Sequence, residues 1–203
     1  MKTDDLVSLL ATGVAPVRPG AAARRIALAL ALSLPLSVAI MVYDLGVRRD
    51  LALAMLWPMF WFKLLFPAAI AAAAFAVVQR LSRPGVRVGR AWIALALPVL
   101  VVWALGLAVW FAAPEAERAP LLWGQTWRQC AFSITIISAP VFVAALLALK
   151  GLAPTRPALA GAGAGALAGG AGAAVYALHC PELTAPFLAV WYVAGIALPV
   201  LAG

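Results

Sequence analysis

Residues 91–112 read AWIALALPVLVVWALGLAVWFA and contain no charged side chain. An α-helix needs about 20 apolar residues to cross the hydrocarbon core of a bilayer, and this stretch is long enough. It is apolar on every face, which is typical of a helix surrounded by lipid or by other helices. The stretch therefore predicts a transmembrane helix, and the fold class depends on how many others the chain holds.

Similar apolar stretches fill most of the chain. Of its 203 residues, 66% are hydrophobic and 11% are charged, whereas soluble domains are about half apolar and about a quarter charged. This composition excludes a soluble enzyme domain, a disordered chain and a disulfide-stapled miniprotein. It predicts an all-α polytopic membrane protein, with a tail over 1–25 and a six-helix bundle over 26–203. The six predicted helices are 26–43, 51–79, 91–112, 128–149, 158–178 and 185–203.

Charge is distributed unevenly between the two sides of these predicted spans. Ten of the fifteen Lys and Arg residues lie on one side, in 1–25, 80–90 and 150–157. The opposite loops carry four basic residues and five of the seven acids; these loops are 44–50, 113–128 and 179–185. Because basic loops stay in the cytoplasm, we expect both termini to be cytoplasmic. The net charge of +8 is thus explained by membrane topology, and no direct binding of nucleic acid is expected.

The two cysteines, Cys130 and Cys180, both fall at the predicted outer face, and the single histidine, His179, precedes the second. Thiolates and imidazole suit soft or borderline metals such as Cu, Zn or Cd. A disulfide is also chemically allowed on that side of a membrane. The remaining alternative is that the cysteines are unrelated small apolar residues. We expect no obligatory cofactor, but a soft metal ion as a possible signal.

Three methionines lie in the outer halves of the first two predicted helices: Met41, Met55 and Met59. Met55 and Met59 are four residues apart, so on one continuous helix they share a face. Their thioethers are potential Cu(I) ligands. The alternative is that they fill gaps in a core, as methionine commonly does.

Lys63 is a charged residue inside the second predicted span, within FWFKLLFP at 60–67. A charge at the centre of a bilayer costs about 3 kcal/mol on insertion scales, so it needs a partner or water. One interpretation is a polar switch within the bundle. The other is a lysine that reaches the interface, or that pairs with carbonyls freed near Pro67.

Glycines recur every four residues in the fifth predicted helix, at Gly161, Gly165 and Gly169. Small residues at this spacing let another helix backbone approach closely. The pattern predicts tight packing within the bundle, with a homodimer contact as the alternative.

The tail begins MKTDDLVSLL, and Leu6, Leu9 and Leu10 lie at helical spacing behind Asp4 and Asp5. So short a helix is marginal alone, but it suits docking into a groove on a cytoplasmic partner. We predict that these five residues bind that partner. The residues that follow, up to Gly20, are predicted to be a flexible tether.

No enzyme motif is present: the sequence contains no Walker A motif, HExxH or CxxC. A single histidine and no carboxylate within the spans leave little for acid–base catalysis, so we predict a protein that is not an enzyme. The same scarcity of polar residues argues against a proton pathway. A small membrane transporter or exporter of a metal or other solute is kept as the alternative function.

Several segments resemble the NrsF family of bacterial inner-membrane proteins. The resemblance rests on MKTDDL at 1–6, FWFK at 60–63, and the block from APTRP at 153–157 through YALHCPE at 176–182 to FLAVWY at 187–192. It covers essentially the whole chain. Family members usually continue to a basic C-terminal end, whereas this sequence stops at Gly203.

This resemblance implies a multi-pass anti-sigma factor of the inner membrane. It implies that the chain binds an extracytoplasmic-function sigma factor at the cytoplasmic face and so regulates transcription. It also associates the outer cysteine pair, here Cys130 and Cys180, with sensing of heavy-metal or related stress. The expected result of sensing is release of the sigma factor.

Overall fold

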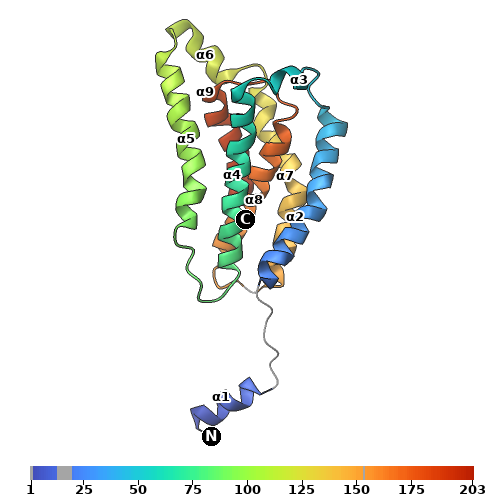
Figure 1. The fold of residues 1–203 in the computed structure, drawn as a ribbon, viewed down its shortest axis with the longest axis vertical. Coiled ribbons are helices and arrows are strands. Elements are labelled where there is room, and N and C mark those ends of the chain that lie inside the picture. The colour runs from blue at the N-terminus through green and yellow to red at the C-terminus, as the bar shows by residue number, and fades with distance from the viewer. Residues whose placement is uncertain (1, 13–19, 153) are drawn as a thin grey trace.

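The computed structural model describes residues 2–12, 20–152 and 154–203, and every regular element within them is a helix (Figure 1). Six long helical stretches run side by side as a bundle, and α1 lies apart from it. The elements are α1 (Thr3–Ala11), α2 (Ala21–Ile40), the π-helix η1 (Met41–Leu45), α3 (Leu51–Ala54), α4 (Pro58–Leu81), α5 (Ala91–Ala112), α6 (Glu115–Trp123), α7 (Trp127–Lys150), α8 (Pro157–Tyr176), α9 (Ala185–Phe187), the π-helix η2 (Leu188–Tyr192) and α10 (Val193–Ala202).

The prediction of six transmembrane helices is confirmed. Within the described residues, six helical stretches are long and apolar enough to cross a membrane. They are Ala21–Leu45, Pro58–Leu81, Ala91–Ala112, Glu115–Lys150, Pro157–Tyr176 and Ala185–Ala202. The first begins five residues earlier than predicted, directly after Gly20 in the left-handed region at φ 82°. The predicted tether, residues 13–19, lies outside the described residues.

The second predicted helix, 51–79, is not continuous, so that prediction was wrong. The short helix α3 ends at Ala54, and α4 begins only at Pro58. Proline suits the first position of a helix because its missing N–H has no partner there. It also disfavours a helical conformation in the residue before it, and Trp57 is accordingly extended.

The segment 113–128, predicted to be a loop, contains the helix α6. Pro114 precedes this helix, and Glu115 and Glu117 lie in its first turn. Carboxylates stabilise the positive N-terminal end of a helix. The two glutamates in the first turn therefore favour a helix in a segment whose polar composition had suggested a loop.

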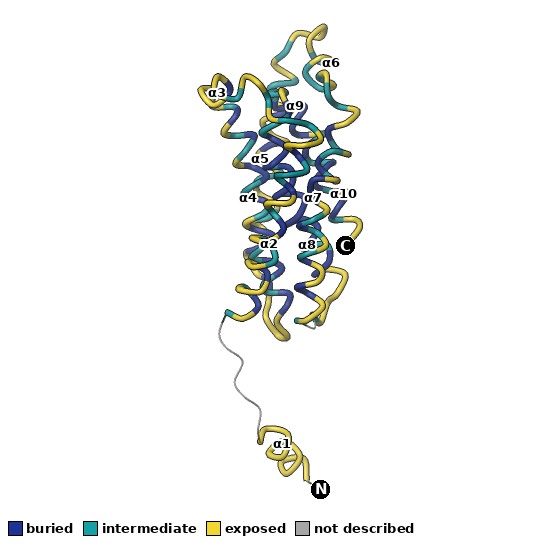
Figure 2. The backbone as a smooth tube through the Cα atoms, turned by 90° about the vertical axis from the view of Figure 1, so that its right-hand side faces the viewer, coloured by how far each residue is buried: buried dark blue, intermediate teal, exposed yellow. Residues whose placement is uncertain are grey.

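The glycine-rich helix α8 occupies the centre of the bundle. Fifteen of its twenty residues are buried, and α4, α7 and α10 pack against it; the tube in Figure 2 is correspondingly dark along this helix. A Cβ atom at Gly169 would lie 2.8 Å from the carbonyl oxygen of Ile196, and Gly161 and Gly165 also face the last helix. The four-residue glycine spacing thus serves packing within the bundle.

The two ends of the bundle differ in charge. We call one the basic end, where α2 and α8 begin and α4 and α7 end. It gathers Arg24, Arg25, Arg80, Arg83, Arg87, Arg90, Lys150 and Arg156. The other, which we call the cysteine end, holds η1, α3, α6 and the segment 177–184. In both views α1 lies beyond the basic end (Figures 1 and 2).

Replacing Gly170 by alanine is expected to lower the free energy of unfolding by about 1–3 kcal/mol, the usual cost of overpacking. A Cβ atom there would lie 2.7 Å from both the Ala71 nitrogen and the Pro67 carbonyl oxygen, which are backbone atoms of α4. In an open helix position, replacing glycine by alanine stabilises by about 0.5–1 kcal/mol. The sign of the change in unfolding free energy therefore tells whether Gly170 is tightly packed or open. Thermal unfolding in detergent measures it, with Ala158→Val at an exposed position of α8 as control.

Candidate functional site

The two cysteines meet at the cysteine end although fifty residues separate them in the chain. Cys130 lies in the first turn of α7, and Cys180 ends the turn that follows α8. Both are fully buried, unbridged, and members of one hydrophobic cluster. The Cys130 thiol lies close enough to affect the pKa of Cys180, so the structure brings this predicted pair together.

Hydrogen bonds hold the segment 177–184 to several elements. The Cys180 N–H donates to the Tyr176 carbonyl at 3.1 Å, which closes the turn after α8. The Arg48 backbone N–H donates to the Leu178 carbonyl at 3.1 Å. The Glu182 carboxylate accepts from the Gln125 N–H at 2.7 Å. The loop that carries Cys180 is therefore attached to α8, to the segment after η1, and to the connection between α6 and α7.

Lys63 supplies the central contact of this loop. Its ammonium is fully buried and donates to the carbonyl oxygens of Cys180, at 2.5 Å, and Glu182, at 2.8 Å. It also lies 5.4 Å from the centroid of the Tyr192 ring, a distance that allows a cation–π interaction. Of the alternatives offered for Lys63, pairing with carbonyls freed near Pro67 is not what the structure shows, because its acceptors are the carbonyls of Cys180 and Glu182. Because α4 begins at Pro58, Lys63 lies in its second turn, closer to the helix end than predicted.

The surroundings of Cys180 favour its thiolate form. The hydrogen bond from the Cys130 thiol is the main cause that holds the pKa of Cys180 well below its usual range. The nearby Lys63 ammonium and a backbone hydrogen bond at Glu182 act in the same direction, and burial opposes them. Since the thiolate is the nucleophile and the metal ligand, we expect Cys180 to be the more nucleophilic thiol of the pair.

Tyrosine and methionine side chains pack in the same cluster as the thiols. The Tyr192 hydroxyl is buried and has no hydrogen-bond partner among the described residues. Its ring centroid lies 5.8 Å from that of Tyr176. Met41 and Met59 pack in the cluster that contains both cysteines. The sequence offered no signal for Tyr192, because a tyrosine near a helix end is common in membrane proteins.

Met55 does not belong to this site. It follows the end of α3 and is 43% exposed, whereas Met59 lies in α4. The prediction that the two methionines share one helix face was therefore wrong, because the break before Pro58 separates them.

His179 contacts the segment after η1 rather than the thiols. Its Nδ1 lies 2.8 Å from the Gly46 carbonyl oxygen, and its ring centroid lies 5.6 Å from that of Tyr176. Among the residues that the structure describes, no three His, Cys, Asp or Glu side chains gather at a metal-binding distance. The geometry therefore offers two thiols as the donor pair and leaves the histidine as a neighbour of the site.

Arg48 and Asp50 form an ion pair that the sequence analysis missed. The Arg48 guanidinium donates to both carboxylate oxygens of Asp50, at 2.8 and 2.7 Å, and also reaches the Cys180 carbonyl at 3.3 Å. The Arg48 guanidinium lowers the pKa of Asp50 to about 2. The pair links the loop before α3 to the loop of Cys180. Its only sequence signal was two opposite charges two residues apart.

The predicted partner-binding residues form a separate exposed helix. Residues Thr3–Ala11 are helical as predicted, and all are exposed. Leu6, Leu9 and Leu10 form one apolar face that is exposed among the residues that the structure describes. The Asp5 carboxylate accepts from the Lys2 backbone N–H at 3.3 Å, which stabilises the first turn of the helix.

Residues 10–203 match the family described as NrsF, negative regulator of sigma F. The chain belongs to the NrsF family. This confirms the resemblance noted in the sequence, and a family of regulators also confirms the prediction that the chain is not an enzyme. No solved structure matches this NrsF family member.

Two NrsF relatives match over nearly their whole lengths. The "Probable anti-sigma-F factor NrsF" of Azospira oryzae is 46% identical over 203 residues, which is 100% of this chain and 95% of the relative. The "Anti-sigma-F factor NrsF" of Caulobacter vibrioides is 38% identical over 197 residues, covering 97% of this chain and 92% of the relative. The similarity therefore includes the bundle, the cysteine end and α1.

The pH dependence of cysteine alkylation is expected to show a midpoint for Cys180 well below the value of about 8.5 for a free thiol. Cys130→Ala is expected to raise this midpoint because it removes the thiol that hydrogen-bonds to Cys180. Lys63→Met is expected to raise the Cys180 midpoint less, because the charge of Lys63 lowers the pKa of Cys180 less than the hydrogen bond from Cys130 does. Mass spectrometry of labelled full-length protein gives the rates, and a Cys180 midpoint unchanged in Cys130→Ala would contradict the geometry.

Proposed function

We propose that this chain is a membrane anti-sigma factor that holds sigma F at the basic end and releases it when a soft metal ion binds Cys130 and Cys180. Family membership and the printed names of both full-length relatives support the first half. The buried thiol pair at the opposite end supports the second half. The observation that carries the proposal is this separation of an exposed helix from a thiol site across one bundle (Figure 1).

The proposed orientation follows the charge of the two ends. Basic segments are retained in the cytoplasm, so the basic end faces the cytoplasm of the bacterial cell and the cysteine end faces outward. Both termini are then cytoplasmic, since α1 lies beyond the basic end and Gly203 packs beside Gly161, near the start of α8. In this proposed orientation, α1 is on the side of the membrane that holds sigma factors and the thiols are on the side that external metal ions reach.

The helix α1 is the proposed sigma-binding element. An amphipathic helix typically binds a partner by laying its apolar face in a groove. The leucine face of α1 is exposed, at 68% for Leu9 and 64% for Leu10. Asp4 and Asp5 lie at the other end of the short helix and favour a basic rim on the partner's groove.

The donor set at the cysteine end fits a soft metal ion. Thiolates and thioethers select Cu(I) and related soft ions, and Met41 and Met59 pack in the same cluster as the two thiols. A structural zinc site takes four protein ligands, and a set of that size is not gathered within the described ranges. Cu(I) or Cd(II) therefore fits better than Zn(II). Binding to both sulfurs releases the Cys130 thiol proton.

A metal on both sulfurs would change the contacts that attach the Cys180 loop to the bundle. The metal replaces the hydrogen bond between the thiols and draws the first turn of α7 toward the 177–184 segment. Lys63 connects that segment to α4, which packs along α8 toward the basic end. A shift in population from 1:99 to 99:1 needs a differential binding energy of about 5.5 kcal/mol, which thiolate–metal bonds readily supply.

Sigma F is expected to copurify with the tagged, full-length protein from membranes of its own host and to dissociate when Cu(I) or Cd(II) is added. Cys130→Ser is expected to keep sigma F bound in the presence of either metal, because one of the two sulfur ligands is gone. Met55→Leu is the matched control, since that thioether lies outside the cluster, and it should release sigma F normally. Normal release from Cys130→Ser would refute the thiol trigger while leaving the inhibitor role intact.

The double substitution Leu9→Ala and Leu10→Ala is expected to abolish copurification of sigma F without changing the melting temperature of the bundle. Ser8→Ala, on the opposite face of α1, is the control and should bind as the parent does. Retention of sigma F by the double variant would contradict α1 as the binding element. Absence of sigma F from well-folded parent protein would favour the alternative of a small membrane transporter.

A further inference from the structure

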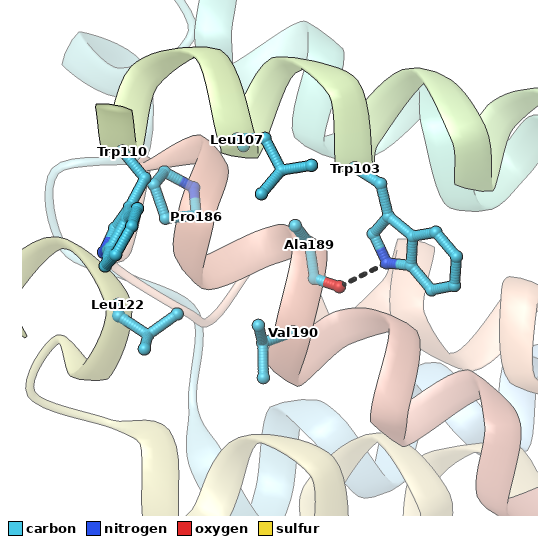
Figure 3. A pocket seen from close by; sticks show the side chains of 8 residues that line it. Trp103, Leu107, Trp110, Leu122, Pro186, Ala189 and Val190 are labelled. Atoms are coloured by element: carbon cyan, nitrogen blue, oxygen red, sulfur yellow. Dashed lines mark hydrogen bonds between the residues drawn. The ribbon is translucent and has the colours of Figure 1, made fainter. Parts of the chain in front are cut away.

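A second concave site lies at the cysteine end, apart from the thiols. It is an apolar groove of about 400 Å³ between α5, the end of α6 and the α9–η2 segment (Figure 3). Its volume falls within the usual range of roughly 300–1,000 Å³ for small-molecule sites. The groove is lined by Trp103, Gly106, Leu107, Trp110, Leu122, Pro186, Ala189 and Val190.

Specific contacts define the walls of this groove. The Trp103 indole N–H donates to the Ala189 carbonyl at 2.9 Å, as the dashed line in Figure 3 shows. Gly106 allows the close approach of the α9–η2 segment, because a Cβ atom there would lie 2.8 Å from the Ala189 Cβ of η2. On the other side, the Trp191 indole N–H donates to the Leu122 carbonyl at 2.9 Å. The groove is therefore a built cavity between elements that hydrogen bonds hold in place.

The groove opens toward the lipid rather than toward water. Its walls belong largely to two of the membrane-spanning stretches, Ala91–Ala112 and Ala185–Ala202. Leu107 and Val190 on its rim are 57% and 42% exposed. In a bilayer, the molecules beside such an opening are phospholipid acyl chains.

A cation lies at the interfacial end of the groove. Arg118 precedes Leu122 by one turn of α6, so the two side chains share a face. The Arg118 guanidinium carbon lies 5.1 Å from the centroid of the Trp110 ring, and its Nε donates to the Ala113 carbonyl at 3.1 Å. The one ion pair found among the described residues does not involve Arg118, so its two terminal nitrogens are available for an anionic ligand.

We propose that this groove binds one phospholipid, with an acyl chain along Leu107 and Val190 and the phosphate on Arg118. The fork of the guanidinium matches two phosphate oxygens, which gives charge-assisted hydrogen bonds. The apolar walls and the single cation together correspond to the two halves of a phospholipid. Such a lipid would join α5 and α6 to the α9–η2 segment. The proposal is independent of the sigma factor and of the metal.

Native mass spectrometry of the purified full-length protein, titrated with dioleoyl phosphatidylethanolamine, tests the proposal. We expect one lipid to bind more tightly than any further lipids. Leu107→Trp fills the groove and Arg118→Gln removes the phosphate contact; each should weaken the first binding event by about tenfold or more. Dioleoylglycerol, which lacks the phosphate, should bind the parent about as weakly as the phospholipid binds Arg118→Gln.

Two matched variants control for general effects on the lipid-facing surface. Leu100→Trp changes a residue of the same helix that is 56% exposed but does not line the groove. Arg128→Gln removes an arginine that also stacks on a tryptophan, 5.3 Å from the Trp127 ring, away from the groove. Both should bind the first lipid as the parent does. Equal binding by all four variants, or equal loss in all four, would overturn the proposal.

Discussion

The buried ammonium of Lys63 is the interaction on which the cysteine end depends. A charge removed from water needs several good acceptors, and Lys63 finds them in the carbonyl oxygens of Cys180 and Glu182 and in the face of Tyr192. Satisfying this one group fixes the loop that carries Cys180 against α4. It also places a positive charge beside the thiol pair. A single buried lysine thus both positions Cys180 and favours its thiolate form.

The helix α8 connects the cysteine end to the rest of the bundle by close packing. Its glycines allow the backbones of α4 and α10 to approach so closely that an added methyl group would meet backbone atoms. Close-packed interiors transmit displacement because they have little free volume. In the proposed function, a change at the Cys180 loop reaches the basic end along α4 and α8, although the sigma factor and the metal never approach each other.

The lengths of the apolar stretches were sufficient to predict the membrane-spanning helices, but packing between residues determined the contacts at the cysteine end. A stretch such as 91–112 becomes a helix in a bilayer, because only a helix lets one segment satisfy all of its own backbone hydrogen bonds there. The break between Ala54 and Pro58 escaped prediction because a local proline effect interrupts a stretch that is apolar throughout. The helix α6 escaped prediction because carboxylates in its first turn stabilise a helix within a segment that looks polar. Lys63 was recognised as unusual, but its acceptors lie over a hundred residues away in sequence.

The sequence by itself determined the fold class, the asymmetry of charge between the two ends, the amphipathic character of residues 3–11, and the family. Each of these follows from properties of neighbouring residues: hydropathy, charge, helical spacing and motif. Only the tertiary structure decided that Cys130 and Cys180 share one buried cluster, that His179 turns toward Gly46 instead, and that Met55 lies outside the cluster. These outcomes depend on how distant helices pack, and residue spacing along the chain carries no information about that packing.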